Sequence, residues 1–270
     1  MKFHKQTSII IFTFFSFGLF YFVDENLFNF FRNWFYNITG SLGVSHIISY
    51  VIVGAPIYLG ASFIARNEGI WSKLGLKRSL IPALLFAAVC VIPMFTGFSY
   101  LFPFYSEIEI DAILVKVIAA GFFEELFFRA FLFGMLYRYT NLGFIPSVLL
   151  GALFFGFVHM YQSTEFIELL GIFGVTFVGA IIFAWAFAEW QFNIWVPIFL
   201  HMLMNLAWDL FNVSATALGD IYANVFRLIT IILIFVITIV YKKKRGEKFE
   251  INSETIWIKT KQNKSQKINL

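Results

Sequence analysis

The sequence predicts an all-α membrane protein, a polytopic bundle of about eight transmembrane helices with both termini in the cytoplasm. Hydrophobic residues make up 60% of the 270 residues and charged residues only 13%, against about 45–50% and about 25% in soluble domains. A fold of this size has too little interior to hide that much apolar surface from water. This composition excludes a soluble enzyme, a nucleic-acid-binding domain and a disordered chain.

Eight apolar stretches approach the roughly 20 residues that a helix needs to cross about 30 Å of hydrocarbon. They are continuously apolar, whereas membrane β-strands alternate in polarity, so helices fit them better. The expected spans are Ser8–Val23, Leu42–Ala65, Leu80–Phe102, Ala112–Leu136, Phe144–Tyr161, Leu169–Phe187, Ile194–Phe211 and Ile221–Tyr241.

Charges between the spans predict the orientation of the bundle. Basic residues precede the first span and follow the second, fourth and eighth, whereas acidic residues follow the first, third, fifth and seventh. Nine of the 20 Lys and Arg residues follow Tyr241. Because basic loops stay in the cytoplasm, both termini are expected there. The phenylalanine-rich, one-cysteine chain with short loops is typical of a multi-pass protein of a bacterial plasma membrane.

The chain divides into four expected parts. Residues 1–79 hold two spans, a basic cytoplasmic loop and an aromatic segment, Leu27–Tyr36, which is expected to lie along the outer surface. Residues 80–211 form the core that contains the mid-membrane polar side chains. Residues 212–241 contain the last span, and residues 242–270 form a basic cytoplasmic tail, expected to be a solvated anchor near anionic lipid.

Ionisable side chains inside a membrane are costly and are therefore functional candidates. The fourth span holds three of them, Glu124, Glu125 and Arg129. Residues four apart share a helix face, so Glu125 and Arg129 can form an ion pair. Adjacent residues point about 100° apart, so Glu124 stays outside this pair and is a candidate general base. The alternative is a charge cluster that only holds helices together.

Two further spans add imidazoles and a carboxamide. His159 lies in the fifth span, and His201 and Asn205 lie four residues apart in the seventh, one turn before Asp209. A lone histidine is often a satisfied core residue, and such polar side chains can also be ordinary interhelical contacts. Together with Glu124, however, they can activate water and stabilise an oxyanion. One Glu and two His are also an acceptable ligand set for a divalent metal such as zinc.

The expected depths of these residues conflict. At 1.5 Å per residue, Glu124 lies about 18 Å below the outer end of its span, and His201 and His159 lie about 10 Å and about 22 Å from the inner ends of theirs. The three side chains meet only if the fifth helix tilts or starts later, for example near Pro146.

The motifs Glu-Glu-x-x-x-Arg, Phe-x-x-x-His and His-x-x-x-Asn, each on a separate span, resemble those of the CPBP family. This family includes the CAAX prenyl endopeptidases of the Rce1 type and bacterial bacteriocin-processing or immunity-type membrane proteases. The resemblance runs from about Leu80 to Asp209, after a weaker lead-in at 74–77. It implies catalytic roles for Glu124 and His159 in activating water. The roles that it implies for the other residues are oxyanion stabilisation by His201 and Asn205 and orientation of the site by Glu125 and Arg129.

The resemblance leaves the cofactor open, because the family has been described both as metalloproteases and as metal-independent glutamate proteases. Glu124, His159 and His201 are the candidate ligands if a metal is used. The sequence has no His-Glu-x-x-His motif, and its single cysteine, Cys90, forms neither an internal disulfide nor a metal motif. Gly121-Phe122-Phe123 departs from the Pro or small residues that many members carry before the two acids, which affects the expected shape of the pocket.

The sequence therefore predicts an intramembrane endopeptidase that acts on a peptide or membrane-protein substrate within the lipid bilayer. One alternative is a non-catalytic membrane immunity or binding protein that keeps the polar cluster to bind a partner. The other is an ion-coupled transporter in which Glu124 and the histidines relay protons. The chain has no internal repeat, and many transporters are built from repeats.

Overall fold

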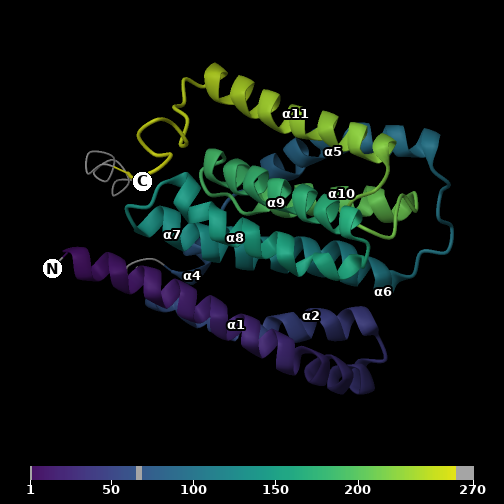
Figure 1. Ribbon diagram of the computed structural model, residues 1–270, viewed down its shortest axis with the longest axis horizontal. Coiled ribbons are helices and arrows are strands. Elements are labelled where there is room, and N and C mark those ends of the chain that lie inside the picture. The colour runs from purple at the N-terminus through teal and green to yellow at the C-terminus, as the bar shows by residue number, and fades with distance from the viewer. Residues whose placement is uncertain (1, 65–68, 260–270) are drawn as a thin grey trace.

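The computed structural model describes residues 2–64 and 69–259, and every regular element in these ranges is a helix. Most helices run along one direction and form an elongated bundle (Figure 1). The predicted all-α bundle is therefore confirmed. Arg66 and residues 260–270, which contributed to the expected charge pattern, lie outside the described residues. The helices in chain order are α1 (Lys2–Thr39), α2 (Leu42–Val53), α3 (Ala55–Phe63), α4 (Ile70–Lys73), α5 (Leu80–Leu101), α6 (Ile110–Ala112), η1 (Ile113–Phe133), α7 (Gly134–Tyr139), α8 (Phe144–Val158), η2 (Met160–Gln162), α9 (Phe166–Glu189), α10 (Trp195–Leu210) and α11 (Ile221–Lys244).

Six helical stretches in the described part of the chain are long and apolar enough to cross a membrane. They correspond to the first, second, third, fifth, sixth and eighth expected spans. The fourth and seventh are helical too, but η1 carries the site charges and α10 has only 16 residues. Eight crossings and cytoplasmic termini therefore remain predictions. The start of α1 and residues 245–259 lie at the same end of the bundle, as an even number of crossings requires (Figure 1).

The first helix is longer than predicted. It runs for 38 residues to Thr39, whereas the first span was expected to end at Val23, with Leu27–Tyr36 as a separate surface segment. The chain has no glycine or proline between residues 19 and 39 to end a helix. Gly40, with φ of +68°, provides the left-handed conformation that ends it. Asp24, expected in an outer loop, is therefore helical.

Two buried hydrophobic clusters hold the bundle together. One cluster packs α1, α2 and α3 against η1, α7, α8 and part of α9. The other packs α5, α10 and α11 against another part of α9. Because α1–α3 share a core with η1, the N-terminal helices are packed into the same unit as the helices that carry the candidate site. η1 and α10 meet where the two clusters adjoin.

The middle of the fourth expected span, η1, is a π-helix. Its hydrogen bonds reach five residues back, as the bond from the Gly134 N–H to the Arg129 carbonyl illustrates. π-Helices usually last a single turn and are frequent at functional sites, whereas this one has 21 residues. A π-helix holds more residues per turn and so advances less per residue than an α-helix. Glu124 therefore lies closer to the Ile110 end of the span than α-helical geometry implies.

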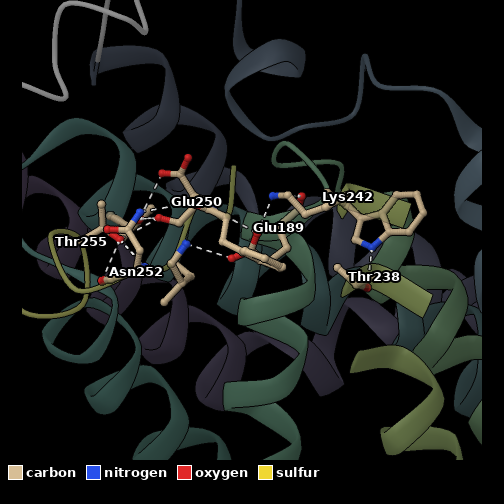
Figure 2. Close-up of polar contacts among 10 residues, drawn as sticks. Glu189, Thr238, Lys242, Glu250, Asn252 and Thr255 are labelled. Carbon is tan, nitrogen blue, oxygen red and sulfur yellow. Dashed lines mark hydrogen bonds and ion pairs between the residues drawn. The ribbon is translucent and has the colours of Figure 1, made fainter. Parts of the chain in front are cut away.

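Residues 245–259 fold back onto the bundle and differ from the solvated tail that the sequence predicted. Glu189, at the end of α9, accepts hydrogen bonds from Nζ of Lys242 at 2.5 Å and from the N–H groups of Glu250 at 3.0 Å and Ile251 at 2.8 Å (Figure 2). A buried carboxylate requires such partners. The ion pair with Glu189 thus stabilises the buried position of Lys242. The two backbone hydrogen bonds to Glu189 hold the following segment against the bundle.

Candidate active site

Glu125 lies at the centre of the polar cluster, and its side chain is fully buried. Its Oε2 lies 3.1 Å from Nε of Arg129, which is the ion pair expected from the i,i+4 spacing. Its Oε1 lies 2.8 Å from Nδ1 of His201 on α10. One carboxylate therefore connects two positively charged or hydrogen-bonding groups on two different helices.

Arg129 is enclosed by aromatic rings. Its guanidinium carbon lies 4.2 Å from the ring centre of Phe155 on α8 and 5.7 Å from that of Phe183 on α9. The electron-rich faces of aromatic rings attract such a cation. Arg129 thereby ties η1 to both α8 and α9, in keeping with the orienting role that the family resemblance implies for it.

A glycine allows His201 to reach Glu125. A Cβ atom at Gly121 would lie only 2.6 Å from Cγ of Met202 and 3.1 Å from the Met202 backbone nitrogen. The absence of a side chain therefore lets the backbones of η1 and α10 approach closely beside His201. Gly121, the first residue of the Gly121-Phe122-Phe123 segment before the two acids, thus has a specific packing function.

Glu124 and His159 form a second, more accessible pair. Nε2 of His159 lies 4.0 Å from Oε2 of Glu124, and the side chains are 18% and 24% exposed, against 0% for Glu125. Nδ1 of His159 lies 2.7 Å from the Phe155 carbonyl oxygen. A carbonyl only accepts hydrogen bonds, so Nδ1 carries the proton and the lone pair of a neutral imidazole is on Nε2. Two acceptor atoms thus face each other across a short gap.

The structure resolves the conflict of depths. α8 begins at Phe144, close to the predicted start, and His159 follows its last residue, Val158. The compressed rise of η1 brings Glu124 toward that same end of the bundle. A later start of α8, near Pro146, is therefore not required for Glu124 and His159 to meet.

Asn205 connects α10 to η1. Its Nδ2 donates a hydrogen bond to the Lys116 carbonyl at 2.8 Å. Nearby, Nζ of Lys116 lies 3.5 Å from Oδ1 of Asp209 in an exposed ion pair. The Asn205 side chain thus makes an interhelical contact, which was the alternative to a catalytic role that the sequence left open. A carboxamide has two N–H donors, so this contact uses only one of them.

The candidate metal ligands do not converge. Over residues 2–64 and 69–259, no three His, Cys, Asp or Glu side chains form a group that could hold a metal ion. Glu124 and His159 form one pair, whereas Nδ1 of His201 is bound to Glu125 in the other. The donor set of Glu124, His159 and His201 therefore does not fit a metal in this structure.

Sequence reasoning missed two features of the site. The contact between Glu125 and His201 joins residues 76 positions apart, and no local spacing signals it. Tyr50 of α2 stacks on Phe123, the residue before Glu124, with ring centres 5.2 Å apart. A tyrosine in an apolar run gives no sequence signal for such a position.

A family model described as type II CAAX prenyl endopeptidase Rce1-like matches residues 107–207. No curated protein matches the chain, and no solved structure does. The family match confirms the resemblance predicted from the three motifs, and it begins later than the expected Leu80. The matched segment contains all six candidate site residues, Glu124, Glu125, Arg129, His159, His201 and Asn205.

Proposed function

Because residues 107–207 belong to the Rce1-like family of CAAX endopeptidases, we propose that this chain is an intramembrane endopeptidase with its active site between η1, α8 and α10. The substrate is a peptide or protein in a membrane. The observation that carries the proposal is the partly exposed Glu124–His159 pair next to the buried Glu125–Arg129–His201 group. Oε2 of Glu124, which faces His159, is buried and has no hydrogen-bond partner among the described residues. The first pair supplies acceptors for a water proton, and the second holds a potential donor in place.

In the proposed reaction, a water molecule hydrogen-bonds to Oε2 of Glu124 and Nε2 of His159. The 4.0 Å between these atoms is too long for a direct hydrogen bond and suits two groups that share one water. Glu124 takes a proton as the water oxygen attacks the carbonyl carbon of the peptide bond. Glu124 then gives this proton to the leaving amine as the carbon–nitrogen bond breaks.

The negative oxygen of the tetrahedral intermediate requires hydrogen-bond donors. Glu125 holds the His201 ring through Nδ1, and an imidazolium held in this way presents its Nε2–H. The second N–H of Asn205, one turn along the same face of α10, is the other proposed donor. No step of this reaction passes through a metal.

Substitution of Glu124 by Gln tests the proposal. Gln keeps the size of the side chain but cannot take up the proton, and loss of a general base typically lowers rates about 10²–10⁴-fold. Cells that produce either protein can be compared by sequencing newly formed peptide ends, and by crosslinking to recover bound, uncut substrate. Glu109→Gln, in an exposed loop, is the matched control and is expected to cleave normally.

The thermal unfolding temperature in detergent should be the same for the wild type and Glu124→Gln, because the Glu125–Arg129 pair is intact. A phenotype that survives Glu124→Gln at normal protein levels would instead indicate a non-catalytic immunity or binding protein. Asn205→Ala is a less specific test, since it also removes the contact with Lys116.

A further inference from the structure

The N-terminus of α8 is capped by backbone from the far end of the chain. The first N–H groups of a helix have no partners within it, and Gly143 at the start of α8 provides no side-chain cap. The N–H groups of Gly143, Phe144 and Ile145 donate instead to the carbonyls of Trp257, Thr255 and Ile256, at 2.7, 2.9 and 2.9 Å. We refer to residues 249–259 as the strap.

This capping accounts for every N–H at the start of α8. Pro146 has no N–H, and the Ser147 N–H already bonds within the helix, to the Gly143 carbonyl at 3.2 Å. The three strap carbonyls therefore satisfy all the donors that the helix leaves open. Gly143 is needed for this arrangement, because a Cβ atom there would collide with the backbone of Trp257.

The strap has its own anchors on the bundle. Glu189 binds the N–H groups of Glu250 and Ile251, and Oγ1 of Thr255 donates to the Glu250 carbonyl at 2.7 Å and closes the turn (Figure 2). Nζ of Lys259 donates to the Tyr137 carbonyl. The helix dipole makes a negative charge unfavourable at a helix C-terminus. The hydrogen bonds and the ion pair that Glu189 forms therefore explain why this acid lies at the end of α9.

The strap is connected to the candidate site through α8. This helix is capped by the strap at Phe144, and His159 follows its other end. The 4.0 Å between His159 and Glu124 depends on where α8 lies along η1. Catalytic rates are sensitive to such placement, and an error of about 1 Å can lower them about 10²-fold.

We propose that the strap is a positioning element of the active site, which fixes α8 along η1 and thereby sets the separation of His159 and Glu124. This inference rests on the proposed function only for its effect on catalysis. The capping and the placement of α8 are independent of it and can be measured without any substrate.

Two cysteine pairs, each in a Cys90→Ser background, test the structural part. Leu142 and Ile258 are an antiparallel bridge pair, whose Cα separation of about 4.5–5.5 Å suits a disulfide. Leu142→Cys/Ile258→Cys is therefore expected to crosslink in membranes, and failure to do so would overturn the docking of the strap. Leu132→Cys/Gly151→Cys reports the placement of α8 on η1, because a Cβ at Gly151 would lie 3.2 Å from Leu132 Cδ2.

Gly143→Ala should push the strap away from α8 without changing any residue of the strap or of the candidate site. Thr255→Val removes the hydroxyl that closes the turn of the strap. Both changes should slow the Leu132→Cys/Gly151→Cys crosslink at least severalfold. Gly174→Ala is the matched control, since nothing lies within 4 Å of a Cβ there, and it should leave the crosslink unchanged. Equal crosslinking rates in wild type and Gly143→Ala would overturn the positioning role.

The catalytic part is tested on the substrate retained by Glu124→Gln. Gly143→Ala and Thr255→Val should lower kcat about 10- to 100-fold with little change in KM, because placement of the reacting groups is affected and substrate binding is not. Closing the Leu142→Cys/Ile258→Cys disulfide in the Thr255→Val protein should restore much of this loss, which a general defect of folding would not allow. Full kcat in Gly143→Ala would overturn the link to catalysis. If Glu124→Gln itself is fully active, the proposed protease fails, while the crosslinks still decide whether the strap positions α8.

Discussion

At the scale of single residues, burial separates the two adjacent acids of η1. Glu125 is fully enclosed and joins Arg129 to His201, whereas Glu124 remains 24% exposed beside His159. The pairing of Glu125 with Arg129 is predictable, because a four-residue spacing on one helix fixes it. The pairing with His201 is not, since it depends on how closely two distant helices pack.

Removal of either member of the buried ion pair should destabilise the protein. Arg129→Ala leaves Glu125 without its cation, and Glu125→Gln leaves Arg129 buried without an anion; such losses typically cost about 3–5 kcal/mol. Thermal or denaturant unfolding in detergent measures the change. The control is Lys116→Ala, since the Lys116–Asp209 pair is exposed and should contribute only about 0–1 kcal/mol. Equal stability of all three variants and the wild type would contradict the burial of the pair.

At the scale of helices, the sequence predicted the apolar runs better than their ends. α1 continues past Val23 because Asp24, Glu25 and Asn26 are polar but contain no helix breaker. The π-helical winding of η1 has no sequence signature that hydrophobic periodicity could detect. The docked strap was missed because the tail after Tyr241 is basic as a whole, with nine Lys and Arg residues, which suggested solvation. The buried carboxylate that anchors the strap, Glu189, lies on another helix.

The close approach of η1 and α10 gives a prediction at this scale. Gly121→Ala should force Met202 and the α10 backbone away from η1, and overpacking of this kind typically costs about 1–3 kcal/mol. Separation of the helices also lengthens the 2.8 Å contact between Glu125 and His201, so turnover should fall along with stability. Unfolding and cleavage assays measure the two effects. Gly179→Ala, where a Cβ would meet nothing within 4 Å, should behave as wild type.

At the scale of the whole molecule, the charge pattern and the fold together predict the topology. The start of α1 and residues 245–259 share one end of the bundle (Figure 1), and the basic residues at that end predict that it faces the cytoplasm. The acidic loops near Glu109 and Glu165 should then lie outside.

Cysteine labelling of intact cells tests this orientation in a Cys90→Ser background. Glu109→Cys and Glu165→Cys should react with a membrane-impermeant maleimide, because both positions are exposed and expected outside. Lys243→Cys, also exposed, should react only after the cells are permeabilised. Labelling of Lys243→Cys in intact cells would contradict the eight-span arrangement or its predicted orientation.

The strap has a consequence for biosynthesis. Trp257 follows Ile145 by 112 positions, so a ribosome adding about 5–20 residues per second needs about 6–22 s to complete the cap after the start of α8 has been made. During that interval η1, α8, α9 and α10 all emerge, yet the N–H groups at the start of α8 still lack their carbonyl partners. The nascent chain therefore holds all six candidate site residues before it holds the segment that positions α8. If the strap acts as proposed, proteolytic competence arrives only after residues 249–259 have been made, when the helices that line the site have already entered the bilayer.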